Sequence, residues 1–536
     1  MTVVSPYSFV SLLLASIGLV LTSNALGEAR CDQSSGIPGT ERLFTEAWGT
    51  RYDGQRYQSA RYTTINAENA GNLALKWVYG FATDKPRSYP LVTEDTLFIG
   101  DGGRGLVALN LESGCLRWEN PEVTDIGSAI VAGRLNGRTL LVFTDRQTGV
   151  YAADAETGDI VWTNGFEALE EPMFSGSPLV HGDVVYVPLS SREIALSLNP
   201  LYGCCRSSGG MVALDLATGE PLWHRPTIEQ PVEQTGKHLL VIKQYGPSGA
   251  PVWGAPTLDA ERGLLFFGTG QNYSHPATDT SDAIFAVWAA SGDVAWHRQF
   301  TAQDVYNMSC EVSQHHPNCP DPSGPDLDFG APPIRMELRD GRSLLLAGQK
   351  SGDVYALNPD TGNVVWKRRF GAGGKLGGVH WGLAADPQRE LIYVPISDSN
   401  VEGNKDRRPG LFALDANSGE VQWFAEREVR CAERKCWTGI SAAISAAPGI
   451  VVAGGLDGRL EILHADTGES LWYFDTMVDL DAVNGVETRG GGIDAHGPML
   501  ADDLLIVSSG YGSFMQEGGN ALLVFELLER ALEDSR

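Results

Sequence analysis

The stretch at residues 354–366 reads VYALNPDTGNVVW, and six other stretches of the chain follow the same pattern. Each copy starts with a short apolar run, passes through a turn that ends in Thr-Gly or Ser-Gly, and closes with Trp. Because Gly tolerates the left-handed backbone that closes a tight turn, each copy predicts a β-hairpin. The other copies are LVALNLESGCLRW ending at Trp118, VYAADAETGDIVW at Trp162, MVALDLATGEPLW at Trp223, IFAVWAASGDVAW at Trp296, LFALDANSGEVQW at Trp423 and LEILHADTGESLW at Trp472.

Between the copies lie further strand-like runs. Examples are GLLFFGTG at 263–270, ELIYVPIS at 390–397 and DLLIVSSG at 503–510. Each repeat period therefore holds about four strands, which is typical of a propeller blade. A blade cannot bury both faces alone, so we expect each motif Trp to pack against the next blade.

The two ends of the chain carry complementary halves of the repeat. LALKWVYGF has Trp77 in the Trp position but no first half, and ALLVFELLE at 521–529 supplies a first half without a Trp. Joined in space, they would complete an eighth blade. The sequence thus predicts an all-β, eight-bladed propeller closed by its N- and C-terminal strands. The alternatives are a seven-bladed ring with stray terminal strands, or an open stack.

The repeats run through most of the 536 residues and leave no room for a second fold. Spacings between successive motif Trp residues vary from 41 to 73 residues, so some blades carry long insertions, which are expected to form loops on the faces of the ring. The predicted divisions are a signal peptide at 1–27, an N-terminal extension at 28–72, the propeller at 73–529 and a C-terminal tail at 530–536.

The N-terminal segment has an apolar core and ends in Ala25-Leu26-Gly27, a small-x-small cleavage pattern that predicts secretion to the periplasm. It has no Lys or Arg before the core, which leaves an uncleaved membrane anchor as the alternative. No other segment is apolar enough to cross a bilayer.

Eight cysteines fit an oxidising compartment. Their spacing favours three local disulfides and leaves a possible fourth pair. The pairs are Cys204 with Cys205, Cys310 with Cys319, Cys431 with Cys436, and Cys31 with Cys115. The net charge of −27 argues against nucleic acid and anionic membrane as partners and favours basic proteins or small molecules, although it is equally consistent with simple solubility.

The repeats resemble those of the pyrroloquinoline quinone (PQQ) dehydrogenases, and the stretch WGTRYDGQRYQSARYTTINAENAGNLALKW resembles the segment that leads into their first blade. Five further phrases are most similar to polyvinyl alcohol dehydrogenases: NPLYGCCRSSGGMVALD, GAPVWGAPTLD, GTGQNYSHPATDTSDAI, PDLDFGAPP and GLDGRLEILHADTGESLWYFDT. Some members carry a fused cytochrome c domain. This chain has no Cys-x-x-Cys-His haem motif, so the resemblance implies transfer of electrons to a separate cytochrome c.

The resemblance implies oxidation of an alcohol, in which Ca²⁺ polarises a quinone carbonyl, a carboxylate accepts the hydroxyl proton and hydride passes to the quinone. Glu193, in PLSSREIALS, matches the family's calcium-binding glutamate. In GTGQNYS the amide ligand matches Gln271 or its neighbour Asn272. For these residues an exposed loop Glu and a turn-forming Asn are the structural alternatives.

Two residues match positions that contact the quinone. Trp253, in APVWGAP, lies outside the repeated Trp position and matches the stacking tryptophan. Lys350 follows LLLAG, which indicates a buried innermost strand, and matches the Lys or Arg beside the quinone oxygens. The other predicted cofactor-binding residues are Ser175, Ser190, Ser191, Cys204, Cys205 and Arg146. Further polar or aromatic residues at blade ends are expected to face the same central opening of the ring: His380, Trp381, Asp398 and Asn400.

The catalytic base is the difficult position. The family carries two aspartates after the fourth repeat, where this chain has Asp304 and Asn307 in QFTAQDVYNMSC. Asn cannot usefully accept a proton. Asp304 is therefore the predicted base and a further candidate metal ligand. One alternative is that a carboxylate from another loop is the base, and the other is that the protein binds PQQ without oxidising alcohols.

Adjacent cysteines form an eight-membered ring when oxidised, and quinoprotein alcohol dehydrogenases place such a ring above PQQ. In those enzymes the pair lies in an earlier blade than Cys204 and Cys205, so the role does not transfer simply. The sequence as a whole predicts a PQQ- and calcium-dependent alcohol dehydrogenase acting on a secondary or polymeric alcohol. The alternative is a cofactor-free propeller that serves as a binding scaffold in the cell envelope.

Overall fold

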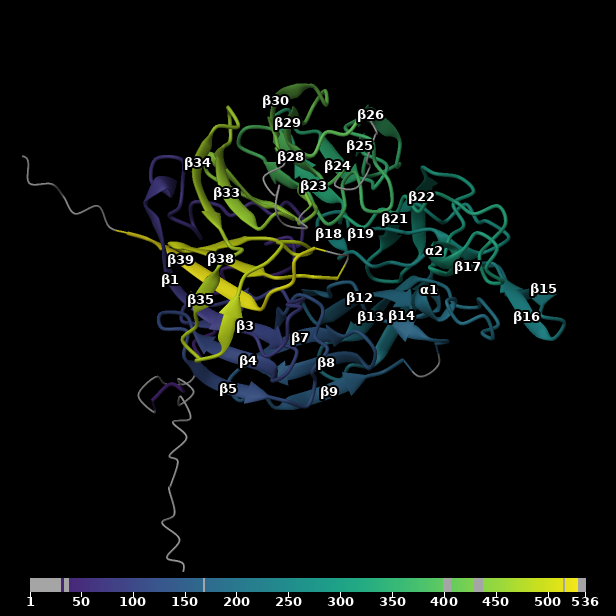
Figure 1. The fold of residues 1–536 in the computed structure, drawn as a ribbon, viewed down its shortest axis with the longest axis horizontal. Helices are drawn as coiled ribbons and strands as arrows, with labels where there is room; N and C mark the ends of the chain where they lie inside the picture. Colours follow the sequence, from purple (N-terminus) through teal and green to yellow (C-terminus); the bar gives the residue numbers. More distant parts are fainter. Residues whose placement is uncertain are drawn as a thin grey trace, which may run out of the picture.

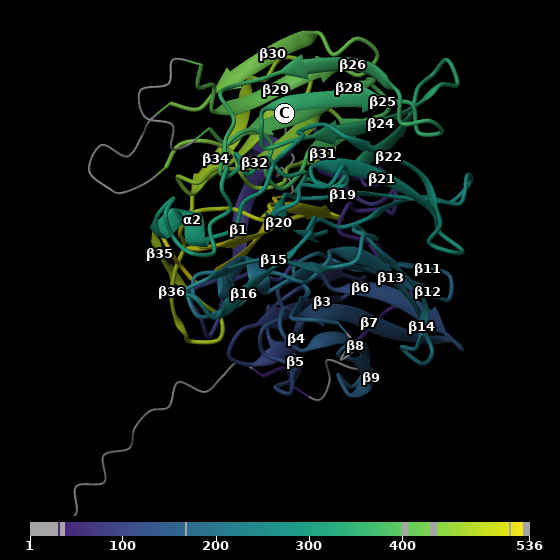
Figure 2. The same cartoon turned by 90° about the vertical axis from the view of Figure 1, so that its right-hand side faces the viewer.

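A computed structural model of the chain describes residues 30–32, 38–166, 169–398, 406–428, 437–513 and 516–528. These residues form eight antiparallel sheets around a common axis, each with four successive strands (Figure 1). Blades 1 and 2 lie across the ring from blades 5 and 6 in both views (Figures 1 and 2). The predicted eight-bladed propeller is confirmed, and the seven-bladed and open alternatives are wrong.

We number the blades along the chain and give their strands from the axis outward. Blade 1 contains β2 (Leu91–Val92), β3 (Thr96–Asp101), β4 (Gly105–Asn110) and β5 (Leu116–Asn120); blade 2 contains β6 (Val131–Leu135), β7 (Arg138–Asp145), β8 (Gly149–Asp154) and β9 (Ile160–Asn164); blade 3 contains β11 (Leu179–His181), β12 (Val184–Ser191), β13 (Gly210–Asp215) and β14 (Pro221–Pro226), with β10 (Pro172–Met173) also paired to β12; blade 4 contains β18 (Thr257–Asp259), β19 (Leu264–Gly268), β21 (Ala283–Trp288) and β22 (Val294–Gln299).

The second half of the ring follows the same order. Blade 5 contains β23 (Ile334–Glu337), β24 (Ser343–Gly348), β25 (Asp353–Leu357) and β26 (Val364–Arg369); blade 6 contains β27 (Ala384–Asp386), β28 (Leu391–Ile396), β29 (Gly410–Asp415) and β30 (Val421–Glu426); blade 7 contains β31 (Ser445–Ala447), β32 (Ile450–Gly454), β33 (Arg459–His464) and β34 (Ser470–Asp475); blade 8 contains β37 (Met499–Ala501), β38 (Leu504–Ser509), β39 (Ala521–Leu527) and β1 (Leu73–Gly80).

The repeated motif builds the contact between neighbouring blades. Each motif Trp donates its indole N–H to a backbone carbonyl of the following blade, as in Trp296 to Pro359 (2.9 Å) and Trp366 to Ala416 (2.8 Å). The indole ring also covers the turn glycine of that blade. A Cβ on Gly362, whose φ is +67°, would lie 2.5 Å from the Trp296 ring. The motif therefore needs Gly both for its backbone conformation and for the close approach of Trp.

The ring closes between the chain ends as predicted. β1 pairs antiparallel with β39 from Leu73 opposite Leu527 to Gly80 opposite Ala521. Trp77 then donates to the Leu111 carbonyl of blade 1 (3.0 Å), and Trp472 of blade 7 donates to the Leu73 carbonyl (3.2 Å). Both seams of the split blade thus use the same indole contact as the rest of the ring.

Residues 43–66, which we call the axial segment, cross one end of the ring. They form isolated bridges to the inner ends of blades 1, 7 and 8: Leu43 with Thr93, Tyr57 with Ala446 and Thr63 with Asp502. These contacts lie at the turns between first and second strands, so the axial segment closes the end of the ring opposite to the carboxyl ends of the second strands.

Arg56 anchors the axial segment and is fully buried. Its guanidinium donates to the Trp48, Ile444, His496 and Pro498 carbonyls and to the Tyr89 and Ser445 hydroxyls at 2.5–3.2 Å. Burial lowers the pKa of Arg56 from its usual value. The side chain joins blades 7, 8 and 1 through neutral acceptors.

Among the residues that the structure describes, the helices are η2 (Ala70–Asn72), α1 (Glu193–Leu196) and α2 (Ser309–Val312), and none of them is long and apolar enough to span a bilayer. Small sheets outside the blades are β15 (Glu233–His238) with β16 (Ile242–Gly246), β17 (Ser248–Gly249) with β20 (Asn272–Ser274), and β35 (Asp479–Asp481) with β36 (Glu487–Arg489). They confirm that long insertions form loops outside the repeated strands.

Three of the four predicted disulfides are present: Cys31–Cys115, Cys204–Cys205 and Cys310–Cys319. The fourth predicted pair, Cys431 and Cys436, lies outside the described residues.

Candidate active site

Predicted site residues lie at equivalent positions of different blades. Arg146 follows β7, Ser190 and Ser191 end β12, Gln271 follows β19 and Lys350 follows β24. Because the second strands of all blades run in the same direction along the axis, their carboxyl ends meet on one face of the ring. The sequence predicted that Lys350 follows the innermost strand of its blade. This is wrong: β24 is the second strand, and β23 is the innermost.

Asp328 connects three of the predicted residues. Its Oδ2 accepts hydrogen bonds from the Trp253 indole N–H (3.1 Å) and the Lys350 ammonium (3.1 Å). Its Oδ1 accepts the backbone N–H of Gln271 (3.0 Å). Asp328 is itself buried, so an indole, an ammonium group and an amide-bearing loop are held around one carboxylate.

Asp326 is the second carboxylate bound to Lys350, with 2.9 Å between Oδ1 and Nζ. Burial raises the pKa of Asp326 to about 7, against the opposing effect of the Lys350 charge. Burial alone would lower the pKa of Lys350, but the Asp326 and Asp328 carboxylates together raise it. The lysine is therefore charged and buried, as its place after an apolar strand requires, and its charge is balanced by aspartates rather than left unpaired.

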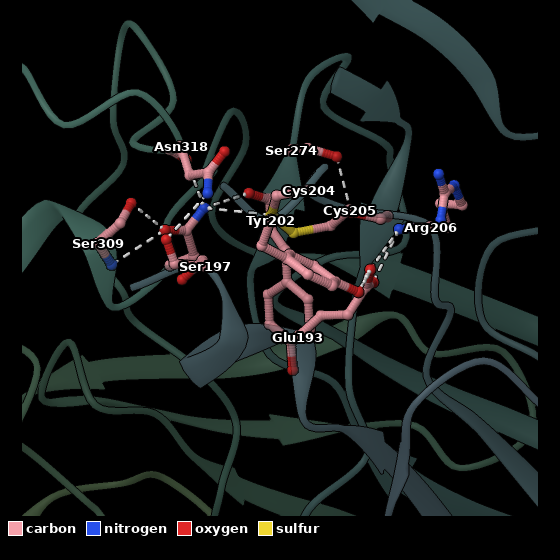
Figure 3. Close-up of a disulfide and its surroundings, with 12 residues drawn as sticks. Glu193, Ser197, Tyr202, Cys204, Cys205, Arg206, Ser274, Ser309 and Asn318 are labelled. Carbon is pink, nitrogen blue, oxygen red and sulfur yellow. Dashed lines mark hydrogen bonds between the residues drawn. A yellow bond between two sulfur atoms is a disulfide. The ribbon is translucent and has the colours of Figure 1, made fainter. Parts of the chain in front are cut away.

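Glu193 begins α1 and is fully buried. Its carboxylate accepts the Tyr202 hydroxyl (2.7 Å), the Ser207 hydroxyl (2.6 Å) and the backbone N–H groups of Arg206 and Ser207 (2.7 Å each at the shorter contacts). Figure 3 shows this carboxylate beside the loop that carries Cys204 and Cys205. The residue is thus an organised internal carboxylate and not an exposed loop Glu.

Tyr273 lies beside the loop that carries Cys204 and Cys205, two residues after Gln271. Its side chain packs against Cys204 and Cys205 and is hydrogen-bonded to Ser190. Burial raises the pKa of Tyr273, and the nearby charges of Asp328, Glu193 and Asp326 raise it further. The segment 271–273 thus contacts Asp328 through the Gln271 N–H and the loop of Cys204 and Cys205 through Tyr273.

The remaining predicted residues have mainly structural partners. The Asn272 amide exchanges hydrogen bonds with Thr278, including the Thr278 N–H at 2.8 Å, and donates to the Ser248 carbonyl. The Asn307 amide donates to the Tyr273 and Asn318 carbonyls (2.9 and 2.8 Å). Both amides are buried and satisfied, so each fixes a loop.

Asp304 is fully buried behind Asp326. Its carboxylate accepts the backbone N–H groups of Asp326 (3.0 Å) and Leu327 (2.8 Å). Burial raises the pKa of Asp304. Asp304 thereby orients the segment that presents Asp326 to Lys350.

Aromatic side chains surround the exposed edge of Trp253. Trp381 and His380 pack edge-on against it, with ring centroids 5.3 and 5.9 Å away. Burial lowers the pKa of His380 to about 3, so its imidazole is neutral at physiological pH. Both residues therefore face the site, as expected from the sequence. Asp398 instead accepts backbone N–H groups of the 372–378 loop, and Asn400 lies outside the described residues.

Ser175 and Arg146 border the same face from blades 2 and 3. The Ser175 hydroxyl is buried without a hydrogen-bond partner among the described residues. The Arg146 carbonyl accepts the N–H of Phe174, and the Arg146 charge reaches Tyr511, which packs on Trp381. An unsatisfied buried hydroxyl is the kind of position that a polar ligand completes.

Sequence reasoning did not single out Asp326, Asp328 and Tyr273. Both aspartates are in PDLDFGAPP, a phrase that served only for the family resemblance. The signal that could have identified them is an Asp-x-Asp pair just before a blade, with its second Asp 22 residues before Lys350. However, the sequence alone does not show which loops meet at the axis.

Known proteins share this repeat and architecture. A family model, PQQ_2, described as "Outer membrane protein assembly factor BamB", matches residues 65–247 and 281–516. A polyvinylalcohol dehydrogenase of Sphingopyxis sp. (strain 113P3) is 34% identical over 483 residues, covering 88% of this chain and 73% of that protein. A polyvinylalcohol dehydrogenase of Pseudomonas sp is 32% identical over 497 residues, covering 90% and 76%.

Among solved structures, the quinohemoprotein alcohol dehydrogenase from Comamonas testosteroni superposes with a TM-score of 0.66 at 19% identity, covering 91% of this chain and 81% of that chain. This likeness concerns the fold. Together with the two sequence relatives, the repeat match and the eight-bladed ring, it shows that the chain belongs to the PQQ-repeat propeller family and is a member of its polyvinyl alcohol dehydrogenase-like group.

Proposed function

We propose that the protein is a PQQ- and calcium-dependent alcohol dehydrogenase that oxidises a secondary or polymeric alcohol. The observation that carries the proposal is the buried group formed by Trp253, Lys350 and Asp328, in which the predicted stacking and cationic residues share one carboxylate. A propeller that only binds other proteins has no need for a buried lysine and two aspartates beside an indole at its axis.

The residues present fit an anionic planar quinone. Lys350 provides a positive charge, the unpaired Ser175 hydroxyl provides a hydrogen-bonding group, and Trp253 provides a flat apolar surface. Ser190 and the Cys204–Cys205 disulfide both contact Tyr273. These contacts support the proposal that both lie near the cofactor. Arg146 adds a second cation from blade 2.

The same region fits a calcium ion. Glu193 would provide carboxylate oxygens, in exchange for some of the hydrogen bonds that they accept, and Gln271 an amide oxygen, and both are hard donors. Asn272 is less suitable, because its amide is neutral and fully engaged: the oxygen accepts the Thr278 N–H and the nitrogen donates to the Ser248 carbonyl and the Thr278 hydroxyl. Within the ranges that the structure describes, no three His, Cys, Asp or Glu side chains converge as a ready-made metal site. We therefore expect the ion to depend on oxygens of the cofactor and to bind together with it.

When bound, PQQ supplies the two-electron acceptor and Ca²⁺ the Lewis acid. The protein must then hold the substrate and accept its hydroxyl proton. Asp326 is better suited than Asp304 to be the base, because its side chain is 13% exposed whereas Asp304 is fully buried, and because it contacts Lys350 and burial raises its pKa to about 7. Asp304, whose oxygens accept two backbone N–H groups, acts as a positioning residue for Asp326.

Electron transfer to a separate, basic cytochrome c agrees with the net charge of −27. A periplasmic location agrees with the cleavable leader proposed for residues 1–27 and with the three disulfides.

Reconstitution tests the proposal. The purified mature chain is loaded with PQQ and Ca²⁺, and reduction of an artificial dye is measured with small primary alcohols, small secondary alcohols and a polymeric secondary alcohol. Turnover with a secondary or polymeric alcohol is expected. Failure to retain PQQ would leave the scaffold function, and retention without turnover on any alcohol would show that the protein binds PQQ but is not an alcohol dehydrogenase.

A further inference from the structure

The hairpin of β15 and β16 carries an unusual tip. It stands outside the ring of blades, at the right-hand edge of Figure 1. Its three loop residues, Leu239, Leu240 and Val241, are 57%, 93% and 73% exposed. Elsewhere in the described chain, exposed large apolar residues occur singly or as the adjacent pair Val364 and Val365. A run of three such residues at the end of a projecting hairpin is the strongest apolar feature of this surface.

The backbone of the tip is also atypical. Leu239 and Leu240 have φ values of +46° and +66°. Hairpin loops usually place Gly, Asn or Asp at such positions, because a side chain in the left-handed region costs about 1 kcal/mol or more. Two exposed leucines therefore occupy positions where small polar residues would be more stable, which is a reason to look for a role outside the folded chain.

The strands below the tip add positive charge. Lys237 lies directly opposite Lys243 in the antiparallel pairing, and His238 is next to them. Like charges at directly opposed positions destabilise a strand pair. Both lysines are exposed, and neither forms an ion pair with any residue that the structure describes. An anionic partner would turn this repulsion into attraction.

The base of the hairpin is firmly attached. Tyr245 in β16 exchanges backbone hydrogen bonds with Cys204 and Cys205 (2.9 and 3.3 Å), and the Gln244 side chain donates to the Pro317 carbonyl (2.7 Å). His238 is hydrogen-bonded to the Pro200 carbonyl (2.7 Å). The tip is thus held out from the face of the ring by two neighbouring loops.

We propose that this tip binds an anionic lipid surface. Leu239, Leu240 and Val241 insert into the headgroup region, and Lys237 and Lys243 contact the lipid phosphates. A fluid bilayer accepts three projecting apolar side chains without a complementary groove, whereas a protein partner would need one. The net charge of −27 opposes approach, but charges beyond a Debye length of about 8 Å are largely screened at physiological ionic strength, so those of the tip dominate at contact.

Vesicle sedimentation tests the inference. The full-length mature protein is mixed with vesicles of phosphatidylcholine alone or with added phosphatidylglycerol. The wild type should sediment with the anionic vesicles, and added salt should release it. Leu240→Asp should lower the partition coefficient about tenfold or more, because a charge replaces the inserted side chain. Lys237→Glu with Lys243→Glu should lower it by a similar factor.

The matched control is Val421→Asp, which introduces the same charge at a 49% exposed position on the outer strand of blade 6. It should bind vesicles like the wild type. No binding of the wild type to anionic vesicles, or equal binding by Leu240→Asp, would overturn the inference. A dimer that sedimentation velocity detects in the wild type but not in Leu240→Asp would also overturn it, since the tip would then bind a second copy of the chain. None of these readouts requires catalysis, so they are independent of the proposed enzymatic function.

Discussion

Two cationic side chains are buried near the axis of this ring, and they are stabilised in opposite ways. Arg56 donates to four carbonyls and two hydroxyls, all neutral, and joins the axial segment to blades 7, 8 and 1. Lys350 lies between two carboxylates after the second strand of blade 5, and the Asp304 carboxylate binds the backbone of one of them. Arg56 is complete within the folded chain, whereas the region around Lys350 has a surplus of negative charge that favours an added cation.

We therefore expect Arg56 to serve stability and Lys350 to serve chemistry. Each of the following experiments tests that assignment, and the variants at the two residues serve as controls for each other.

The largest effect is expected from Asp326→Asn. Loss of the general base should lower kcat of the reconstituted protein by about 10²–10⁴-fold, because the hydroxyl proton then has no acceptor. Steady-state dye reduction measures this value. Asp304→Asn is the matched variant and should cost less, since Asp304 acts through the backbone of Asp326. A larger loss in Asp304→Asn than in Asp326→Asn would return the role of base to Asp304.

Lys350→Gln should lower kcat by about 10²–10³-fold, because a cation that stabilises developing negative charge is lost. Its fold should persist, as judged by circular dichroism and thermal unfolding. Wild-type turnover in Lys350→Gln would exclude contact between this residue and the cofactor.

Arg56→Met should have the reverse pattern. Four carbonyls and two hydroxyls lose a buried donor, so the free energy of unfolding should fall by about 3 kcal/mol or more. Denaturant unfolding measures this change. The protein that remains folded should retain wild-type kcat, and a specific loss of kcat without loss of stability would show that Arg56 serves the reaction and not the fold.

Asp326 should also control how stability and activity depend on pH. Asp326 has a pKa of about 7 in the folded chain, and about 4 is expected when unfolded. Between these values the folded state holds a proton that the unfolded state has lost, so this group makes stability fall as pH rises from about 4 to 7. Activity should rise over the same range, because the base must be ionised. In Asp326→Asn the free energy of unfolding should lose this dependence on pH. Denaturant unfolding of both proteins at a series of pH values measures the difference.

The smallest effects are expected in the repeated frame. Gly362→Ala should destabilise the fold by about 1–3 kcal/mol, since it meets both a positive φ and the Trp296 ring. Gly341→Ala is the control: its φ is +85°, but its added Cβ meets nothing within 4 Å, so only the backbone cost of about 1 kcal/mol remains. Equal losses in the two variants would mean that Trp docking contributes little.

The sequence predicted the frame because the frame repeats. Seven complete copies of one hairpin and two complementary halves determine the number of blades and the closure between β1 and β39. Trp253 and Lys350 could be predicted as site residues because each matches a family position: Trp253 lies outside the repeated Trp position, and Lys350 follows an apolar strand. The Asp326–Asp328 pair could not, because it lies in an insertion without periodicity whose position depends on tertiary contacts with Asp304 and Gln271.

The role of Arg56 was also hidden in the sequence. An arginine in a polar N-terminal segment is usually exposed. Only the folded ring shows that this one is surrounded by carbonyl groups from blades 7 and 8 and from the axial segment itself.

The most direct test of the shared site is PQQ binding by equilibrium dialysis, in Ca²⁺ and in chelator, to the wild type, Glu193→Gln and Lys350→Gln. We expect Ca²⁺ to strengthen binding to the wild type. Each substitution should weaken binding about tenfold or more, and Glu193→Gln should also reduce the effect of Ca²⁺. Unchanged affinity in both variants would contradict the account, because Glu193 and Lys350 would then not belong to one cofactor site.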